Sequence, residues 1–465
     1  MGRLGSWLGL QPARLVTERA VRVADRRPHR DPDTVTLELS AMQSQIATPK
    51  TDSNDPVGSF EALSVPNFRS FVIGQGISLV GSWTETVAQA ILVLQLTNSA
   101  RAVGFATAAR YLPVLLLTPY AGLLVDRMSK RRILILTASL LALLSLTQAV
   151  LVLTHLIQME IVYAVALVFG CLSALDNPAR QAFIPEMVGK RLIRNAVTIN
   201  STMVNVGRAV GPLVAALLIE TIGIGWCFLV NAASFAAVLI ALAAMHPAAL
   251  FPVKRIAPAR GQLVEGFRYA LTVPEIIVPV MMMALIGTFT YEFEVSLPVF
   301  AKMTLAGGPA AYSWLLGAFG AGSVVGGVYC MLRPETGLRR LIRASLLYAV
   351  GMAAVACSPS EAVAVPLLFI VGLASITFIT TGNSTIQLAS APEFRGRVTA
   401  LWSTAFVGST PIGASIIGLI DAANPRWGLA VGAVACAAAA MLGIGATRRP
   451  APPKKRFPHD PSQVG

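Results

Sequence analysis

Charged residues are scarce in this chain of 465 residues, and that scarcity excludes an ordinary soluble fold. Only 13% of the residues are Asp, Glu, Lys or Arg, whereas 55% are hydrophobic. A soluble globular protein averages about a quarter charged residues. Together with a mean hydropathy of +0.66, this composition predicts an integral membrane protein.

Histidine and cysteine are also few, with four and five residues. The histidines fall in tails, loops or span ends, and the cysteines lack metal-ligand spacing. We therefore expect no metal site, no cofactor and no hydrolase that needs a histidine within the membrane. The chain also lacks a G-x-x-x-x-G-K-[ST] phosphate loop, which disfavours an ATP-driven pump. These absences together predict that the protein is not an enzyme.

Long apolar runs recur from about residue 68 to residue 446. Each is long enough to cross a hydrocarbon core of about 30 Å as a helix. We predict an all-α integral membrane protein with twelve transmembrane helices, at residues 68–96, 102–125, 133–153, 158–180, 195–219, 226–246, 274–299, 311–332, 340–357, 363–389, 399–420 and 427–446.

The net charge of +14 is unevenly distributed. Basic residues gather in every second loop between the predicted spans and in both tails, and the intervening loops hold few. This is the positive-inside pattern, which predicts a plasma (inner) membrane protein with both termini in the cytoplasm. The same distribution argues against a nucleic-acid partner.

The second half of the chain repeats features of the first at an offset near 206 residues. The run Gly81–Thr84 matches Gly287–Thr290, and Asn177 matches Asn383. We predict two parallel six-helix pseudo-repeats. The expected domains are a disordered cytoplasmic tail (1–65), an N-terminal half (66–247), a cytoplasmic linker (248–270), a C-terminal half (271–447) and a basic cytoplasmic tail (448–465). Residues 1–41 hold seven arginines and no lysine, so an upstream start codon assigned in error is an alternative to a translated tail.

A strongly basic loop joins the second and third predicted spans. Asp126 ends an apolar run at the negative end of a helix dipole, where a carboxylate needs cationic partners. The run Gly122–Arg132 resembles the loop between helices 2 and 3 of the major facilitator superfamily, G-x-L-a-D-R-x-G-R-[KR], with Ser129 in place of a glycine. The resemblance implies the major facilitator fold, a substrate site between the halves, and a cytoplasmic gate at Gly122, Asp126, Arg127, Arg131 and Arg132.

The segment Asp176–Glu186, at the end of the fourth predicted span, resembles one branch of that superfamily. This is the transmembrane secretion effector branch, which includes enterobactin exporters and macrolide efflux proteins. Asp176 and Arg180 are four residues apart, so we expect them to pair on one helix face near the cytoplasmic gate.

Gly207, Gly211 and Pro212 in the fifth predicted span resemble the antiporter motif G-x-x-x-G-P-x-x-G-G. The small residues allow a neighbouring helix to approach closely, and the proline favours a kink. Ala215 and Ala216 replace the last two glycines, so the partial match supports export over uptake without deciding it.

Five charged residues fall inside the predicted spans: Glu85, Arg110, Arg208, Glu292 and Glu294. A charge at the bilayer centre costs roughly 2.5–3.5 kcal/mol, so each is a candidate for proton coupling or for lining the substrate cavity. Glu85 and Arg110 are expected at one depth, about 5 Å to the outer side of the middle, where an ion pair is plausible. Either the pair is a structural clamp, or Glu85 binds a proton under the control of Arg110.

Glu292 and Glu294 lie about 200° apart around a helix, which predicts that only one of them faces the cavity squarely. Glu292 is the deeper and the preferred proton-binding candidate, and a structural role at the outer gate is the alternative. Arg208 is expected to pair with an acidic group or an anionic substrate.

The sequence therefore predicts a secondary active transporter, with proton-coupled efflux of a bulky amphipathic drug or siderophore by alternating access. Trp83, Phe289, Tyr291 and Met281–Met283 offer an apolar wall for such a molecule, or face lipid. The alternatives are a proton-coupled uptake symporter and, less favoured, a non-transporting sensor or scaffold. The expected partners are a small-molecule substrate, protons and the lipid bilayer, and we expect a monomer.

Overall fold

The computed structural model describes residues 60–251, 262–333, 335–391 and 394–448, which all belong to one compact unit, Ser59–Gly465. The predicted tails and much of the predicted linker lie outside the described residues. The predicted division into two halves stays a prediction, because the contacts define a single unit.

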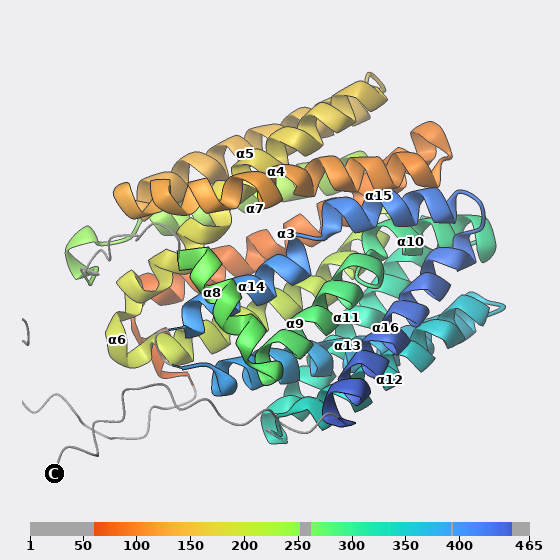
Figure 1. Ribbon diagram of the computed structural model, residues 1–465. Coiled ribbons are helices and arrows are strands. Elements are labelled where there is room, and N and C mark those ends of the chain that lie inside the picture. Colours follow the sequence, from red (N-terminus) through yellow and green to blue (C-terminus); the bar gives the residue numbers. More distant parts are fainter. Residues whose placement is uncertain (1–59, 252–261, 334, 392–393, 449–465) are drawn as a thin grey trace, which may run out of the picture. The chain divides into compact units, whose positions relative to one another are not determined.

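Helices make up the described part of the N-terminal half (Figure 1). After the short 3₁₀ helix η1 (Glu61–Ser64) come α3 (Pro66–Thr97), α4 (Ala100–Arg127), α5 (Lys130–Leu153), α6 (Met159–Thr221), α7 (Gly225–Ala243) and the 3₁₀ turn η2 (Pro247–Ala249). The connections are short because local backbone geometry ends each helix. Asn98, for example, ends α3 in the left-handed region at φ 49°, and Ser99 caps α4 directly after it.

The described part of the C-terminal half is helical as well. It comprises α8 (Gln262–Thr272), α9 (Pro274–Phe289), α10 (Phe293–Val299), the π-helical turn η3 (Phe300–Thr304), α11 (Pro309–Leu332), α12 (Leu338–Cys357), α13 (Glu361–Ala389), α14 (Arg395–Val407), α15 (Thr410–Asp421) and α16 (Pro425–Arg448). Proline at the first position of α9 and α16 sets the backbone angle for a helix and lacks only an N–H that would have no partner there.

Eleven helical segments of the described residues are long and apolar enough to cross a membrane. One of them, α6, has 63 residues and contains a non-helical residue, Gly189, at φ 69°. The predicted spans 158–180 and 195–219 both lie in α6, on either side of Gly189. An unbroken helix of that length would extend about 95 Å, roughly three hydrocarbon thicknesses. Two crossings separated at Gly189 fit better, but the count of twelve stays a prediction.

Besides α6, two of the candidate spans are interrupted within their length. The first, Pro274–Thr304, breaks between α9 and α10 at Thr290–Glu292, and the second, Arg395–Asp421, breaks between α14 and α15 at Gly408–Ser409. Non-helical backbone at membrane depth is tolerated where protein buries it or where it lines a cavity. The space next to each interruption is therefore a candidate for a cavity.

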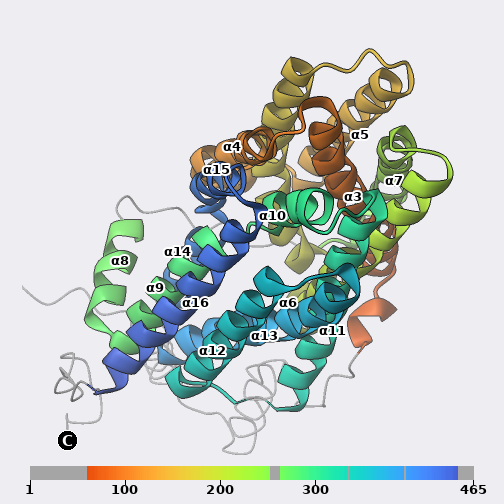
Figure 2. The same ribbon diagram turned by 90° about the vertical axis from the view of Figure 1, so that its right-hand side faces the viewer.

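Glycines let helices of the two predicted halves pack closely. A methyl group added to Gly104 of α4 would lie 3.0 Å from the Cα atom of Gly418 in α15. One added to Gly320 of α11 would lie 2.7 Å from the Cα atom of Ala209 in α6. The views agree that α4 runs beside α15 (Figures 1 and 2). Small residues at these positions allow the backbones to touch.

The buried apolar side chains form two clusters. One contains Phe71, Phe183 and Met187 and lies among α3, α5, α6 and α7. The larger one includes residues from both predicted halves, among them Phe228, Phe300 and Phe378. Since apolar tails of lipid surround such helices, tight packing rather than burial from water holds them together.

Candidate functional site

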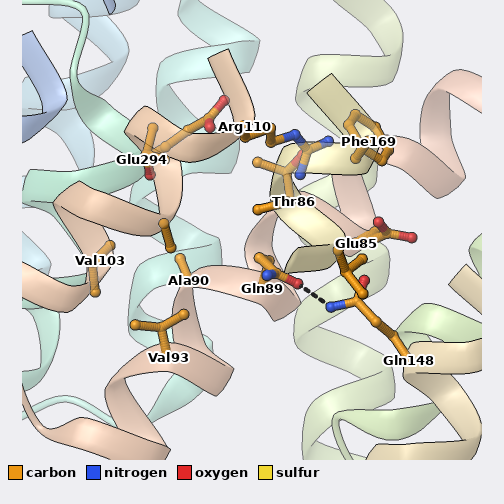
Figure 3. Close-up of a pocket in the computed structure, with 14 residues that line it drawn as sticks. Glu85, Thr86, Gln89, Ala90, Val93, Val103, Arg110, Gln148, Phe169 and Glu294 are labelled. Atoms are coloured by element: carbon orange, nitrogen blue, oxygen red, sulfur yellow. Dashed lines mark hydrogen bonds between the residues drawn. The ribbon is translucent and has the colours of Figure 1, made fainter. Parts of the chain in front are cut away.

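A small pocket lies among α3, α4, α5, α6 and α10, and we call it the Glu85 pocket (Figure 3). Its volume is about 30 Å³. The polar side chains that line it are Glu85, Thr86, Gln89, Thr107, Arg110, Gln148 and Glu294. A cavity needs about 10–15 Å³ of such volume to hold one water, so the Glu85 pocket has room for a water or two and is too small for an organic substrate.

Glu85 is 2% exposed and receives two hydrogen bonds on Oε2, each 2.5 Å long. The donors are the hydroxyl of Ser145 in α5 and the amide of Asn231 in α7. Next to them, the Gln148 amide donates to Gln89 Oε1 at 2.8 Å (Figure 3). A carboxylate buried in this way is stabilised by neutral donors.

The predicted ion pair between Glu85 and Arg110 is absent from the ion pairs of the described residues. The Arg110 guanidinium lies over the ring of Phe169 instead, with Cζ 3.8 Å from the ring centroid (Figure 3). This is a cation–π contact. Both residues nevertheless line the same pocket, so their predicted proximity is present without the pair.

A larger cavity lies beside this pocket, and we call it the Arg208 cavity. Its volume is about 160 Å³. The polar or charged residues that line it are Thr107, Tyr111, Arg208, Tyr291, Glu292, Glu294 and Thr410, and its apolar walls are Trp83, Phe293, Leu316, Phe319, Phe406 and Val407. Both predicted halves contribute, and residues at both helix interruptions take part. Thr107 and Glu294 line the Glu85 pocket as well, so the two spaces adjoin.

Arg208 in α6 supplies a guanidinium to this cavity. Its Cζ atom lies 5.0 Å from the centroid of the Trp83 ring, and its buried Nε has no hydrogen-bond partner. The expected acidic partner is not found among the described residues. Because this N–H has no partner in the protein, Arg208 can donate it to a hydrogen-bond acceptor of a substrate.

Glu292 is 3% exposed, and its Oε1 atom has no hydrogen-bond partner. It stands directly before the first residue of α10, with a non-helical backbone (φ −83°, ψ 39°). An unpartnered buried carboxylate is costly, so such a group in a native protein needs an explanation such as a bound proton or a ligand.

Glu294 accepts a hydrogen bond of 3.1 Å from the Tyr111 hydroxyl of α4. The expectation that only one of Glu292 and Glu294 faces the cavity is wrong, because both line it. The expectation assumed a continuous helix, and the chain is not helical from Thr290 to Glu292. Backbone rotation at the interruption brings both carboxylates to one cavity.

The predicted basic loop is mostly helical, because only Met128 and Ser129 separate α4 from α5, and Arg131 in the first turn of α5 holds this region to α7. Arg131 donates from Nε to the carbonyl of Leu242 at 2.7 Å and from Nη2 to that of Ala243 at 3.0 Å. Both carbonyls are at the end of α7, where a cation is favoured. Gly122 and Arg127 lie in α4, Arg127 and Arg132 are exposed, and the side chain of Asp126 lies outside what the structure describes. The gating role of these residues stays a prediction.

Asp176 and Arg180 form the ion pair that their spacing predicts. Asp176 is 4% exposed and also accepts from the Thr137 hydroxyl at 2.7 Å. The structure thus places a satisfied buried carboxylate on α6, and its part in a cytoplasmic gate stays a prediction.

The glycines of the fifth predicted span pack against α3. A methyl group on Gly207 would lie 3.0 Å from Cβ of Leu79, and one on Gly211 would lie 2.9 Å from the carbonyl oxygen of Val80. The Gly211 carbonyl accepts from the Thr84 hydroxyl at 3.0 Å. The close approach expected from these residues is present, and α6 stays helical through Pro212.

Several polar partners of the charged residues are not evident from the sequence. Tyr111, Ser145 and Asn231 contact the glutamates, and Asp421, which is 1% exposed, accepts from Ser296 at 2.8 Å. One signal was available, since Gln89 is one helical turn after Glu85 and shares its face. The other contacts join residues far apart in the chain.

Helices long and apolar enough to span a membrane, around a cavity lined by charged residues, are typical of a multi-pass membrane transporter. The comparison with known families specifies it further. A model described as transmembrane secretion effector matches residues 57–460, so the chain belongs to that family.

Three curated relatives illustrate the range of the family. The chain is 27% identical to the multidrug efflux pump Tap of Mycolicibacterium fortuitum over 76% of this chain and 87% of the relative. It is 23% identical to the enterobactin exporter EntS of Escherichia coli O1:K1, over 77% and 86%. It is 30% identical to the staphyloferrin A transporter of Staphylococcus aureus, but only over 35% of this chain and 42% of that relative.

Solved transporters share the fold. A bacterial homologue of the human lysosomal transporter Spinster, in an inward-facing and unoccupied conformation, gives a TM-score of 0.63 at 15% identity, covering 82% of this chain and 94% of that one. The nucleoside transporter NupG gives 0.64 at 12% identity, covering 84% and 100%. At these identities the likeness concerns the fold alone.

Proposed function

We propose that the protein is a secondary active exporter in the plasma (inner) membrane that exchanges protons for a bulky amphipathic molecule. The observation that carries the proposal is a pair of adjoining spaces of unequal size. The Glu85 pocket admits water and protons, and the Arg208 cavity admits an organic group. In transporters built from two repeats, the sites for the substrate and for the coupling ion lie near the bilayer midplane between the repeats.

The Arg208 cavity has the chemistry of a site for an aromatic or amphipathic group. Trp83, Phe293 and Phe406 supply apolar faces, and Arg208 Nε and Glu292 Oε1 are a buried donor and a buried acceptor without hydrogen-bond partners. About 160 Å³ resembles the volume of an engineered cavity that takes benzene, and drug-sized pockets begin at about 300 Å³. In this conformation the cavity therefore accommodates one ring of a bulky substrate, and binding of the whole molecule requires it to widen.

Alternating access supplies that change. The close approach at Gly104 lies toward the end of α4 that the charge pattern predicts to be outside, and the one at Gly320 lies midway along α11. Separating the helices from the middle to the predicted outer end would widen the cavity toward the outside. With both termini in the cytoplasm, as predicted, the basic α4–α5 loop is on the inner side.

The proton gradient provides sufficient energy for such a cycle. One elementary charge that crosses 100 mV gains about 2.3 kcal/mol, which maintains about a fifty-fold substrate gradient. The names of Tap and EntS describe efflux and export, which supports an outward direction for this chain.

The test is substrate-driven proton movement in proteoliposomes, followed with a pH-sensitive dye and a panel of hydrophobic drugs and siderophores. Wild type is compared with Glu85→Gln, and the matched control is Glu160→Gln at the start of α6, outside both spaces. We expect proton flux opposite to substrate flux in wild type and in the control, and loss of proton flux in Glu85→Gln.

Proton flux in the same direction as substrate would overturn export in favour of uptake. Antiport unchanged by Glu85→Gln would make Glu85 a structural carboxylate and leave Glu292 and Glu294 as the candidate proton carriers. Absence of transport for every compound would contradict the proposed substrate class.

A further inference from the structure

One hydrogen bond joins the two spaces of the site across the predicted halves. Tyr111 Oη donates to Glu294 Oε1 at 3.1 Å, and the two residues are 183 positions apart. Tyr111 comes from α4 and lines the Arg208 cavity, whereas Glu294 comes from α10 and lines both the cavity and the Glu85 pocket. Glu294 therefore stands where proton pocket and substrate cavity meet.

Other charged groups around Glu294 have different partners or lie elsewhere in the site. The titratable and charged residues that line the two spaces, or that lie on elements packed against α10, include Glu85, Arg110, Tyr111, Arg208, Tyr291, Glu292, Lys302, Tyr312, Asp421 and Arg426. Lys302 donates to the Leu94 carbonyl, Arg426 donates to the Ser358 carbonyl, and Asp421 accepts from Ser296. Among these groups, Tyr111 makes the hydrogen bond to Glu294.

The strength of this bond depends on the charge of Glu294. A hydrogen bond to an ionised carboxylate is about twice as strong as one between neutral groups. The contact is thus stronger while Glu294 is ionised and weaker after it binds a proton. By linkage, separation of α4 from α10 makes proton binding at Glu294 easier, and proton binding makes separation easier.

The contact lies close to the packing of α4 on the C-terminal half. Gly104, two turns before Tyr111 on α4, touches α15 at Gly418, and α10 also packs against α15. A movement that opens the gap between α4 and α15 would also pull Tyr111 away from Glu294. The same hydrogen bond therefore depends on both the conformation and the proton.

We propose that Tyr111 is a positioning residue that couples protonation of Glu294 to the separation of α4 from α10. With the halves together, Tyr111 holds ionised Glu294 and a proton leaves it. With the halves apart, Glu294 loses this donor and takes up a proton. The inference rests on the proposed proton-coupled export, and it names the residue pair that links the proton to the movement.

The experiment compares wild type, Tyr111→Phe, Glu294→Gln and the double variant in proteoliposomes, using the panel compound that wild type moves fastest. Two quantities are measured, namely protons moved per substrate and substrate exchange at equal pH, which needs no net proton flux. Tyr120→Phe is the matched control, because Tyr120 is on the same helix and is 72% exposed.

We expect Tyr111→Phe to keep exchange within about two-fold of wild type and to lower the proton-to-substrate ratio about five-fold. In the Glu294→Gln background, Tyr111→Phe should lower the ratio no further, because its effect passes through the carboxylate. Glu294→Gln alone should make exchange independent of pH over the range in which wild type responds.

A wild type without opposed proton flux would overturn the proposed function and this inference with it. A wild type that couples protons, with Tyr111→Phe at the wild-type ratio, would overturn the inference alone. Equal losses of exchange and coupling in both backgrounds would show a merely structural role for Tyr111. If Tyr111→Phe does not fold, a normal pH response of Glu294→Gln still refutes the proposal.

Discussion

Helix α3 and the segment α9–α10 occupy matching positions in the predicted repeat, yet they hold their glutamates in opposite ways. Helix α3 is continuous, and Glu85 receives donors from two neighbouring helices. The α9–α10 segment is interrupted, and Glu292 at the interruption has a carboxylate oxygen without a partner.

The fold supplies hydrogen-bond donors to the carboxylate of Glu85, whereas it leaves one carboxylate oxygen of Glu292 free to bind a proton or a ligand. Glu85 contributes to the stability of its half while ionised, because removing a donor would leave a buried charge unsatisfied. Glu292 lowers stability in the absence of a proton or ligand. Changes to the two glutamates and their partners should therefore alter stability with opposite signs.

The largest effect is expected from Asn231→Leu. The substitution removes one of the two donors to Glu85 and leaves the carboxylate buried, so the free energy of unfolding should fall by about 3 kcal/mol. Thermal unfolding in detergent micelles measures the loss. The double variant Glu85→Leu, Asn231→Leu replaces the polar contact with an apolar one and should recover most of the stability. A loss as large in the double variant as in the single one would show that Asn231 acts by packing.

The second prediction concerns Glu292, whose substitution should raise the free energy of unfolding, whereas Asn231→Leu should lower it. Glu292→Gln removes a buried charge that has no partner on one oxygen, so stability should rise by about 2 kcal/mol. The same melting experiment should show a fall for Glu85→Gln, because the Ser145 and Asn231 donors both bond to one carboxylate oxygen, and a neutral amide oxygen in its place accepts weaker hydrogen bonds. If Glu292→Gln and Glu85→Gln both lowered the melting temperature, the inferred difference between a stabilising Glu85 and a destabilising Glu292 would be wrong.

The sequence was sufficient to predict those features that follow from the bilayer or from the geometry of a single helix. Apolar runs of span length located the helices, because a crossing segment must satisfy its own backbone. The spacing of Asp176 and Arg180 predicted their ion pair, since residues four apart share a helix face. The five intramembrane charges could be selected because such charges are costly.

The partners of those charges could not be predicted, because they depend on how separate helices meet. Asn231 is 146 positions from Glu85, and no local pattern relates them. The interruption at Thr290–Glu292 was also missed, so the orientation assigned to Glu294 was wrong. A helical wheel holds only where the backbone remains helical.

A smaller effect should follow from tightening the contact between the predicted halves. Gly320→Ala places a methyl group 2.7 Å from the Cα atom of Ala209, where the backbone cannot yield, at a cost of about 2 kcal/mol to this conformation. That cost corresponds to about a thirty-fold shift toward conformations with α6 and α11 apart. Spin labels at Leu217 and Trp314, both exposed, measure the separation by pulsed electron resonance, with the exposed Cys171 and Cys357 replaced.

The control for that shift lies on the same helix. Gly327→Ala adds the same methyl group to α11, where no atom lies within 4 Å of it. The distance distribution should then match that of the unsubstituted protein. Equal distributions for Gly320→Ala and Gly327→Ala would show that the close approach at Ala209 does not limit the movement.

The smallest effect concerns the two arginines, each of which lies over an aromatic ring. Arg208→Lys keeps the charge but loses the planar contact with Trp83, so the KM for a transported compound should rise about five-fold, or about 1 kcal/mol, with little change in kcat. Arg110→Lys makes the matching change over Phe169, in a pocket of about 30 Å³ that no organic substrate enters. Its KM should stay at the wild-type value. A KM that rises equally in both variants would mean that substrate contacts both spaces, and the division into a proton pocket and a substrate cavity would be wrong.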